Sequence, residues 1–594
     1  YHNIVALLTE SASADIATPV TVTREQLMGS ADQARDIRRY GFNMQMADPW
    51  WGGEWRLGDI VSYQDIAALS YLKQAARYRQ EYVLGRWQMA AETIEKGEEE
   101  GPYAYVIPAD QADAATAADL VRTLVLQGVQ VHQALDPFSA EPEEGMHVPG
   151  VSFADEDEEV GDEAGEEEGE KEEEDEDEQG EEGELRTFPA GSWVVLGAQP
   201  SRAAVLDLLQ PVARELLVEY AEGPYVRSYD GAAYTMPLQM GVEAVRVDEP
   251  FEASLTPVPR GATWAPPLPE VRSTYGLSAA ANRSYEAANR LLASGFQVSR
   301  ADGWFLVAAA QPGVLEALER LRTERGLVVT ADPAGVEGGQ PMRASRVGLY
   351  QGWAASMDEG WTRLLLEQYG FGPITLSNAD VRAGDLDQRF DVVILPSEIP
   401  LRRLVDGTPE GDAPPEYVGG IGQEGVDNLK AFVRAGGTLV TLDQGDQVVL
   451  AHFGVPVRDA LQGVGGRDFF APASLFRLEV DGSHPLADGT ADTVAAKWAN
   501  GRAYEPTGFG GEATSIRTVA SWAKDPAGLL MSGLVAGAER MAGKAAVLDV
   551  SYGQGRIYMY GFRVQHRAQT AGTFRLLFNA LMRTGNRTAT QDGA

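Results

Sequence analysis

Glu10 is the first side chain in the sequence whose position suggests chemistry. It lies two residues after the apolar segment Asn3–Leu8, which has the composition of a buried strand. A carboxylate at the end of such a strand lies where the ligand sites of α/β sheets collect. There it can act as a general base that accepts a proton from water, or it can simply cap the turn after the strand. The position favours the general base.

Metal chemistry has little support from the residues that usually supply it. The chain has no Cys, so it has no thiolate ligand, no disulfide and no Cys nucleophile. No His is followed by Glu three residues later, and no two histidines have the spacing of a ligand pair. We therefore expect no zinc site built within this chain. The six histidines are His2, His132, His147, His452, His484 and His566.

Two acidic residues follow a later apolar segment. Thr438–Leu442 predicts a buried strand, and the turn after it reads Asp443-Gln444-Gly445-Asp446. Asp443 and Asp446 could be catalytic. The interpretation that the pattern favours is capping of the helix that follows the strand.

A group of polar and basic residues near the end of the chain could form a pocket. It consists of Arg563, His566 and Arg567, together with the segment Ser356–Trp361. Such a pocket would suit a small molecule or the carboxylate of a peptide. Polar residues at the start of a helix also have a purely structural explanation, because they interact favourably with the helix dipole.

The net charge of −39 is concentrated in one place. Residues Asp155–Glu184 contain 21 acidic residues and one Lys. This run has almost no apolar side chains and its charges repel each other, so we predict a disordered insertion over about residues 150–186. A solvated spacer is favoured over cation buffering or binding of a basic partner.

Composition also excludes two classes of partner. No cluster of Lys and Arg offers a surface to nucleic acid or to an anionic membrane. The longest apolar stretches fall well short of the roughly 18 residues that a membrane span needs. We therefore predict no nucleic-acid binding and no membrane span.

The middle of the chain contains an internal repeat. Residues 124–131 and 291–298 have similar sequences, and so do residues 191–200 and 303–312. Each pair predicts the same order of helix and strand. We predict a duplicated small α/β unit over residues 101–340, with the acidic run inserted in a strand connection of the first copy.

Residues 341–594 alternate strand and helix patterns, which predicts a doubly wound sheet. An antiparallel hairpin and a closing helix are expected at the end. The expected strands are 346–350, 390–396 and 438–443, the expected helices are 358–369, 423–435 and 572–582, and the hairpin covers 545–562.

The N-terminal 100 residues resemble the end of the catalytic domain of bacterial zinc carboxypeptidases, in the carboxypeptidase A-like superfamily. The stretches that carry the resemblance are Tyr1–Ser13, Pro49–Gly53 and Arg56–Tyr63. The resemblance implies that Glu10 is the general base that activates a zinc-bound water, that peptides are substrates of the intact protein, and that the protein is secreted or periplasmic. In that family the zinc ligands, an H-x-x-E pair and a distant His, precede this glutamate. Zinc is thus implied for the intact protein and not for this chain alone.

The resemblance extends to the C-terminal part, which looks like a glutamine-amidotransferase-like domain. An active domain of that kind carries Cys on a sharp strand-to-helix turn, with His and Glu as partners. The corresponding turn here is Asp443–Asp446, so ammonia-forming chemistry is excluded.

These observations predict an α/β protein of three parts. Residues 1–100 are expected to be the C-terminal part of a zinc-carboxypeptidase-type α/β domain, 101–340 the duplicated unit, and 341–594 a flavodoxin-like, amidotransferase-type doubly wound domain. We expect a fragment of a metallocarboxypeptidase-like protein that begins inside a domain and is inactive alone. The alternatives are a noncatalytic binding or scaffold protein, and a hydrolase with an Asp nucleophile in the last domain.

Overall fold

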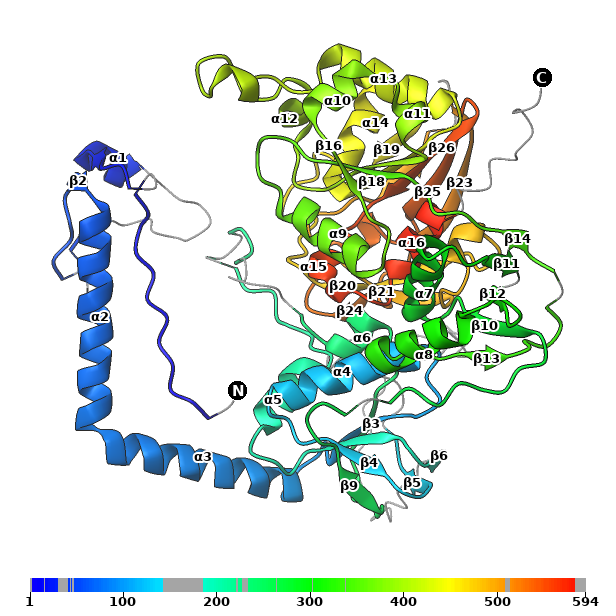
Figure 1. Cartoon of the computed structure of the whole chain (residues 1–594). Coiled ribbons are helices and arrows are strands. Elements are labelled where there is room, and N and C mark those ends of the chain that lie inside the picture. The colour runs from blue at the N-terminus through cyan, green and yellow to red at the C-terminus, as the bar shows by residue number, and fades with distance from the viewer. Residues whose placement is uncertain are drawn as a thin grey trace, which may run out of the picture. The chain divides into compact units, whose positions relative to one another are not determined.

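The computed structural model divides into two compact units, Tyr1–Glu100 with Ala198–Ala204 (unit 1) and Gly101–Gly197 with Val205–Ala594 (unit 2; Figure 1). The predicted acidic insertion lies outside the described residues. None of the described helices is long and apolar enough to cross a bilayer. The structure describes residues 3–14, 17–29, 41–42, 44, 47–142, 185–218, 220, 223–226, 233–262, 264–301, 303–336, 338–507 and 513–582.

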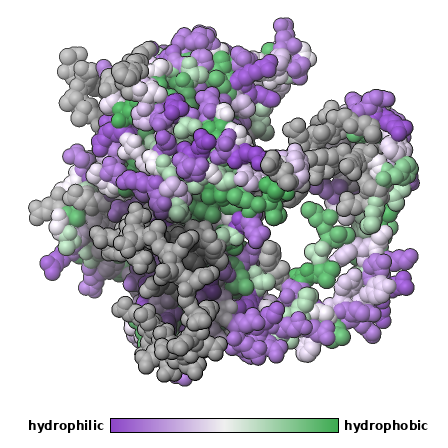
Figure 2. Space-filling view, turned by 180° about the vertical axis from the view of Figure 1, so that it is seen from behind, coloured by the Kyte–Doolittle hydropathy of each residue, from purple (hydrophilic) through white to green (hydrophobic). Residues whose placement is uncertain are grey.

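Unit 1 is built mainly from two long helices. Helix α2 (Leu57–Arg77) is followed at once by α3 (Arg79–Glu99), and the break falls at Tyr78. None of the residues of α2 is buried. Apolar side chains lie on the surface of this unit, at the right of the view in Figure 2. The remaining elements of the unit are α1 (Arg24–Gly29) and the antiparallel pair β1 (Val20–Val22) and β2 (Gly53–Trp55).

The prediction of a buried strand at Asn3–Leu8 is wrong. The segment is extended but pairs with no strand in the described part of the chain, and the side chains of Ile4, Leu7 and Leu8 are 62%, 66% and 85% exposed. Side chains of α2 hold it instead, as where the Tyr71 hydroxyl donates to the carbonyl oxygen of Val5 at 2.8 Å. The apolar pattern therefore has no neighbouring strand on which to form a sheet.

Unit 2 contains two small antiparallel sheets with corresponding strand orders. The sheets run β8-β3-β7-β4-β9 and β13-β10-β12-β11-β14, so each strand of one has a counterpart in the other. The first contains β3 (Ala104–Ile107), β4 (His132–Ala134), β7 (Trp193–Leu196), β8 (Val245–Val247) and β9 (Leu255–Pro257), with α4 (Ala114–Leu126) and α5 (Arg202–Leu209). The second contains β10 (Thr274–Ser278), β11 (Ser299–Ala301), β12 (Trp304–Ala308), β13 (Thr330–Ala331) and β14 (Gln340–Pro341), with α7 (Asn282–Ala293) and α8 (Val314–Arg325).

The two sheets differ in one strand connection. In the first, β5 (Phe138–Ala140) and β6 (Arg186–Phe188) lie between β4 and β7 and pair with each other in antiparallel fashion. The second runs from β11 to β12 with no such pair. The β5–β6 pair therefore brings together the two ends of the segment that contains the acidic run.

The largest sheet of unit 2 begins with five parallel strands in the order β16-β15-β17-β18-β26. Numbered along the chain, this is the order 2-1-3-4-5 of flavodoxin-like sheets. The strands are β15 (Val347–Tyr350), β16 (Ile374–Leu376), β17 (Val392–Leu395), β18 (Thr438–Leu442) and β26 (Gly555–Tyr560).

Helices cover both faces of this sheet, which explains why most residues of its strands are apolar (Figure 1). In β17, Val392 and Ile394 belong to one core cluster and Val393 and Leu395 to the other. The first cluster includes residues of α9 (Met357–Gln368) and α16 (Phe574–Met582), and the second includes residues of α10 (Asn378–Ala383), α11 (Leu386–Arg389) and α13 (Gly422–Arg434).

An antiparallel extension continues the sheet beyond β26 in the order β25-β23-β20-β21. Of the strands in this extension, only β25 was expected from the sequence, as the first strand of the predicted hairpin with β26. The protein is therefore a mixed α/β protein with several sheets. The strands of the extension are β19 (Val457–Asp459), β20 (Leu475–Val480), β21 (Thr493–Lys497), β22 (Tyr504–Pro506), β23 (Ala513–Trp522), β24 (Leu530–Ser532) and β25 (Ala545–Tyr552). Short helices complete unit 2: α6 (Met236–Met240), α12 (Leu401–Val405), α14 (Gln447–His452), α15 (His566–Gln569), and the 3₁₀ turns η1 (Pro415–Tyr417), η2 (Asp443–Asp446), η3 (Pro485–Ala487) and η4 (Ala538–Arg540).

Candidate functional site

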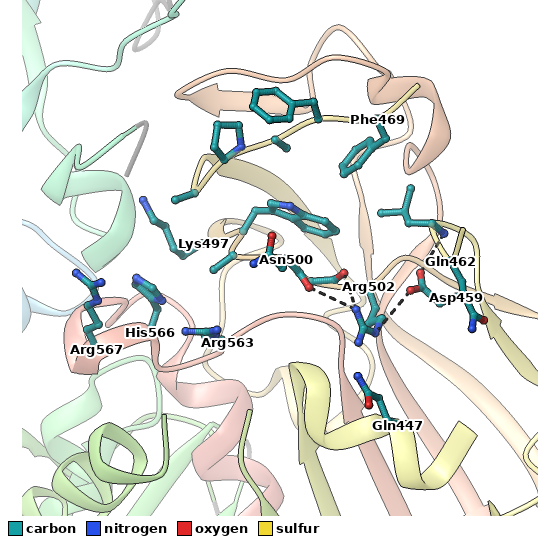
Figure 3. Close-up of a pocket in the computed structure, with 18 of the residues that line it drawn as sticks. Gln447, Asp459, Gln462, Phe469, Lys497, Asn500, Arg502, Arg563, His566 and Arg567 are labelled. Carbon is teal, nitrogen blue, oxygen red and sulfur yellow. Dashed lines mark hydrogen bonds and ion pairs between the residues drawn. The ribbon is translucent and has the colours of Figure 1, made fainter. Parts of the chain in front are cut away.

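A cavity of about 990 Å³ lies within unit 2, where the parallel strands meet the antiparallel extension. It receives side chains from the loop after β26, from the loop after β21 and from α14 (Figure 3). The polar and charged residues that line it are Tyr234, Gln239, Gln447, Asp459, Gln462, Lys497, Asn500, Arg502, Arg563, His566, Arg567 and Gln569. Its apolar wall includes Leu461, Phe469, Phe470, Pro472 and Trp498.

The turn η2 is buried and lies beside this cavity. Asp443 follows β18 directly and has a φ of 47°, a left-handed conformation that costs a non-glycine residue free energy. The turn packs tightly against β17, because a Cβ at Gly445 would overlap the carbonyl oxygen of Leu395. Asp443 and Asp446 are both fully buried and do not line the cavity.

Arg563 is held between two carboxylates. Its Nη1 donates to Glu398 Oε1 at 2.9 Å and its Nε donates to Asp443 Oδ2 at 3.4 Å. Asp443 Oδ2 also accepts from the hydroxyl of Ser397 at 2.7 Å. The Nη2 of Arg563 makes no hydrogen bond with any residue that the structure describes, and the side chain lines the cavity. The guanidinium is thus fixed on one side and available to a ligand on the other.

Arg502 forms longer ion pairs with a different pair of carboxylates. Its Nε lies 3.6 Å from Asp446 Oδ1 and 3.6 Å from Asp459 Oδ2. Asp446 also accepts a hydrogen bond from the hydroxyl of Tyr504 at 2.8 Å. Within the described residues, Arg502 Nη2 has no hydrogen-bond partner. Figure 3 shows Arg502 on the side of the cavity opposite Arg567 and His566.

Burial changes the protonation of the carboxyl groups behind the arginines. It raises the pKa of Asp446 to about 7, although Arg502 and the hydroxyl of Tyr504 favour the charged form. Burial also raises the pKa of Asp443. It raises the pKa of Asp358 to about 6, although the hydrogen bond from the N–H of Ser397 favours the charged form. Near neutral pH Asp446 therefore carries less than its full negative charge, which leaves Arg502 less completely neutralised.

The rest of the lining adds positive charge. The side chains of Lys497 and Arg567 reach the cavity beside His566 (Figure 3). Burial, helped by these two cations and Arg563, lowers the pKa of His566 to about 3. The imidazole is therefore neutral. Its Nδ1 is buried without a hydrogen-bond partner among the described residues, so a ligand could bind it.

Backbone strain is concentrated around the cavity. Non-glycine residues with positive φ are uncommon. The described chain has nine of them, and six lie on the lining or next to it in sequence or contact. These six are Glu398, Asp443, Ala473, Asn500, Arg567 and Ala568.

The structure places the residues of the predicted pocket in two layers. Arg563, His566 and Arg567 all line the cavity. No residue of Ser356–Trp361 does, but Asp358 lies behind the lining and supports it. Its carboxylate accepts from the side chain of Gln565 at 2.7 Å, next to His566.

The prediction that Asp443 and Asp446 cap the helix after β18 is wrong. No side-chain cap bond is made at the start of η2 or α14, and both carboxylates instead bind arginines. Sequence reasoning missed Arg502, Lys497 and Asp459. They come from the antiparallel extension and belong to no recognisable motif, and only the fold brings them to η2.

Glu10 lies elsewhere, in unit 1. It is exposed, in the extended segment that forms no strand. Its assignment as a general base stays a prediction. His2 lies outside the described residues. Within those residues no group of three or more His, Asp or Glu side chains could hold a metal ion, so the residues at hand do not fit zinc and we derive no step through it.

Comparison with known proteins gives only distant likenesses. No family model matches the chain, and no curated protein matches it. A cytoplasmic protein from Salmonella typhimurium is 12% identical over 40% of this chain and 99% of its own length, with a TM-score of 0.26. A putative ThuA-like protein from Bacteroides uniformis is 12% identical over 41% of this chain and 95% of its own length, with a TM-score of 0.24.

A β-galactosidase from Rahnella sp. R3 is 15% identical over 40% of this chain, with a TM-score of 0.23. The match covers 31% of that enzyme. At these TM-scores the likenesses carry no argument, and the strand order of the sheet is what describes the fold.

Proposed function

We propose that the doubly wound part of unit 2 is a binding domain for a small organic anion and has no glutaminase activity. One observation carries the proposal: Arg502 and Arg563 each form ion pairs with two carboxylates, and both line a cavity of about 990 Å³. Cavities of this size suit small organic ligands.

The fixed arginines favour an anion for two physical reasons. A guanidinium that is already held in place loses little side-chain entropy when a ligand binds, and it offers a planar pair of donors that suits carboxylate and phosphate groups. Asp446 is also not fully charged at neutral pH, because burial raises its pKa to about 7. Lys497 and Arg567 add to the positive charge of the cavity.

The alternative chemistry of the turn η2 is less well supported. Without Cys the turn cannot form the thioester of an amidotransferase. An Asp nucleophile would have to reach its substrate, but Asp443 is fully buried and lies behind Arg563. These observations favour the noncatalytic binding protein over the hydrolase. Zinc-dependent hydrolysis of C-terminal peptide bonds by an intact secreted or periplasmic protein remains a separate proposal, supported only by the N-terminal sequence resemblance.

Calorimetric titration of the full chain tests the proposal directly. A panel of carboxylates and phosphates should include ligands that bind, whereas their neutral amide analogues should not. Replacing Arg563→Met should weaken binding about tenfold to 100-fold, the effect of losing a hydrogen bond between charged groups. Arg320→Met, at an exposed position of α8, is the matched control and should leave binding unchanged. Equal binding by wild type and an Arg502→Met/Arg563→Met double variant would refute the site.

A further inference from the structure

We infer that the exposed face of helix α2 is a dimerisation surface, which pairs in antiparallel fashion with the same face of a second copy of this chain. The surface lies in unit 1, and the inference does not depend on the anion site of unit 2. It rests on the apolar side chains that this helix exposes and on the symmetric order of the charges among them.

Helix α2 has few contacts within the chain to stabilise it. It is 21 residues long and none of them is buried, although helices in proteins owe most of their stability to an apolar face that packs against a neighbour. The extended segment at the start of the chain lies along one side of α2, where the side chains of Gln64 and Tyr71 make hydrogen bonds to it (Figure 1). The opposite side of the helix remains exposed.

The exposed side is centred on Leu69. Leu69 precedes Tyr71 by two residues, and at 3.6 residues per turn this places the two side chains about 200° apart around the helix axis. Ile66 and Leu72, three residues to either side of Leu69, share its face. Ile66, Leu69 and Leu72 are 65%, 66% and 61% exposed. Large apolar side chains that gather on one exposed face mark an interaction surface.

The charges on this face identify the partner. Asp65 lies four residues before Leu69 and Lys73 four residues after it, so both share the face with Leu69. Neither makes an ion pair with any residue that the structure describes. When two copies of α2 run antiparallel about a two-fold axis at Leu69, Asp65 of each copy lies opposite Lys73 of the other. A parallel pair would instead bring like charges together at both positions, which is repulsive.

The rest of the face has the same symmetry. Ile66 and Leu72 exchange places about the axis, so an apolar side chain meets an apolar side chain on both sides of it. Ser62 and Ala76, seven residues before and after Leu69, are both small and exposed, which allows the helices to approach closely at either end. The face is therefore complementary to itself, as a two-fold interface requires.

Sedimentation equilibrium of the full chain tests the inference. The buffer should contain about 150 mM salt, which screens the net charge of −39. An interface of one helix per chain is small for a specific complex, so the average mass should rise from one chain towards two between about 1 and 100 µM. Leu69→Glu places two carboxylates on the axis and should keep the protein monomeric. Gln74→Glu is the matched control, because it adds the same charge at an exposed position of α2 outside this face and should leave association unchanged.

Charge exchange distinguishes this pairing from a nonspecific apolar contact. Asp65→Lys and Lys73→Asp, made singly, place like charges opposite each other. Each should weaken association about tenfold, because the symmetry changes two pairs at once. The double variant Asp65→Lys/Lys73→Asp restores opposite charges across the interface and should recover the association of wild type. Both positions are exposed, so circular dichroism should show an unchanged fold in all three variants.

Disulfide formation reports the direction of the helices, because the chain has no Cys of its own. Leu69→Cys places two thiols on the axis, and oxidation should join two copies. Ser62→Cys alone should not cross-link, since residue 62 of the second copy lies about 21 Å away along the helix axis. A mixture of the Ser62→Cys and Ala76→Cys variants should cross-link.

Three results would overturn the inference. The first is a wild type that stays monomeric up to about 100 µM. The second is a Leu69→Glu variant that still dimerises, or a double charge exchange that associates no better than the single variants. The third is cross-linking of Ser62→Cys with itself, which would show a parallel pair.

Discussion

Asp446→Asn should make the protein more stable at neutral pH, by an amount that depends on pH in a defined way. Asp446 is fully buried, and burial raises its pKa to about 7. In the unfolded chain an Asp has a pKa of about 3.9. The folded protein therefore binds a proton that the unfolded chain has released, so ionisation of Asp446 destabilises the fold. This cost is absent below about pH 4, grows as the pH rises, and is complete above about pH 7.

The magnitude follows from the difference in pKa. Roughly three units at 1.36 kcal/mol each give on the order of 4 kcal/mol. Asn occupies the same volume and can still accept the hydrogen bond from the hydroxyl of Tyr504. The difference in free energy of unfolding, variant minus wild type, should therefore become more positive between about pH 4 and pH 7 and then level off.

Urea denaturation of both proteins at one-unit intervals from pH 4 to pH 8 measures this difference. Asp481→Asn is a control, because hydrogen bonds from the hydroxyl and N–H of Ser483 lower the pKa of that exposed carboxyl. Its contribution changes only below about pH 4, so the difference between this variant and wild type should stay nearly flat from pH 4 to pH 8. A difference for Asp446→Asn that is flat across the range, or that falls with pH, would refute the argument.

Three further predictions follow from other parts of the chain. Asp391→Asn should destabilise the protein at pH 7, because hydrogen bonds from two arginines outweigh burial and hold the pKa of Asp391 well below its usual value; melting curves should show the difference shrinking as the pH falls through that low range. Gly445→Ala should cost about 1–3 kcal/mol in the free energy of unfolding, measured in urea, because its Cβ would overlap the carbonyl oxygen of Leu395. Deleting Asp155–Glu184 should leave the melting temperature nearly unchanged, since β5 and β6 already bring the ends of that segment together; a large drop would contradict this.

The sequence predicted best the central strands, which are buried on both faces, and the helices that cover them. The strands β15, β17 and β18 and the helices α9 and α13 lie within two residues of the expected positions. Continuous apolar runs identify such strands, because helices cover both faces of the sheet. The similarity of residues 124–131 and 291–298 indicated a repeat, and the structure has two small sheets with corresponding strand orders.

The site could be predicted only in part, because its residues come from segments that are far apart in the sequence. Arg563, His566 and Arg567 are neighbours in sequence and drew attention together. Arg502 lies on another loop, and nothing local distinguishes it from the many surface arginines of the chain. The wrong prediction at Asn3–Leu8 has a different cause. An apolar segment shows that its own residues favour a strand, but it does not show whether a neighbouring strand exists to pair with it.

The strained backbone around the cavity has a consequence for protein engineering. Asp443, Asn500 and Arg567 adopt a conformation that glycine adopts without cost. A screen of random variants for heat resistance should therefore return substitutions at these positions repeatedly, and each would remove a side chain from the cavity or its support. Selection for thermostability alone would therefore remove the side chains that line and support the cavity. Variants recovered in that way would mark residues that serve binding and not folding.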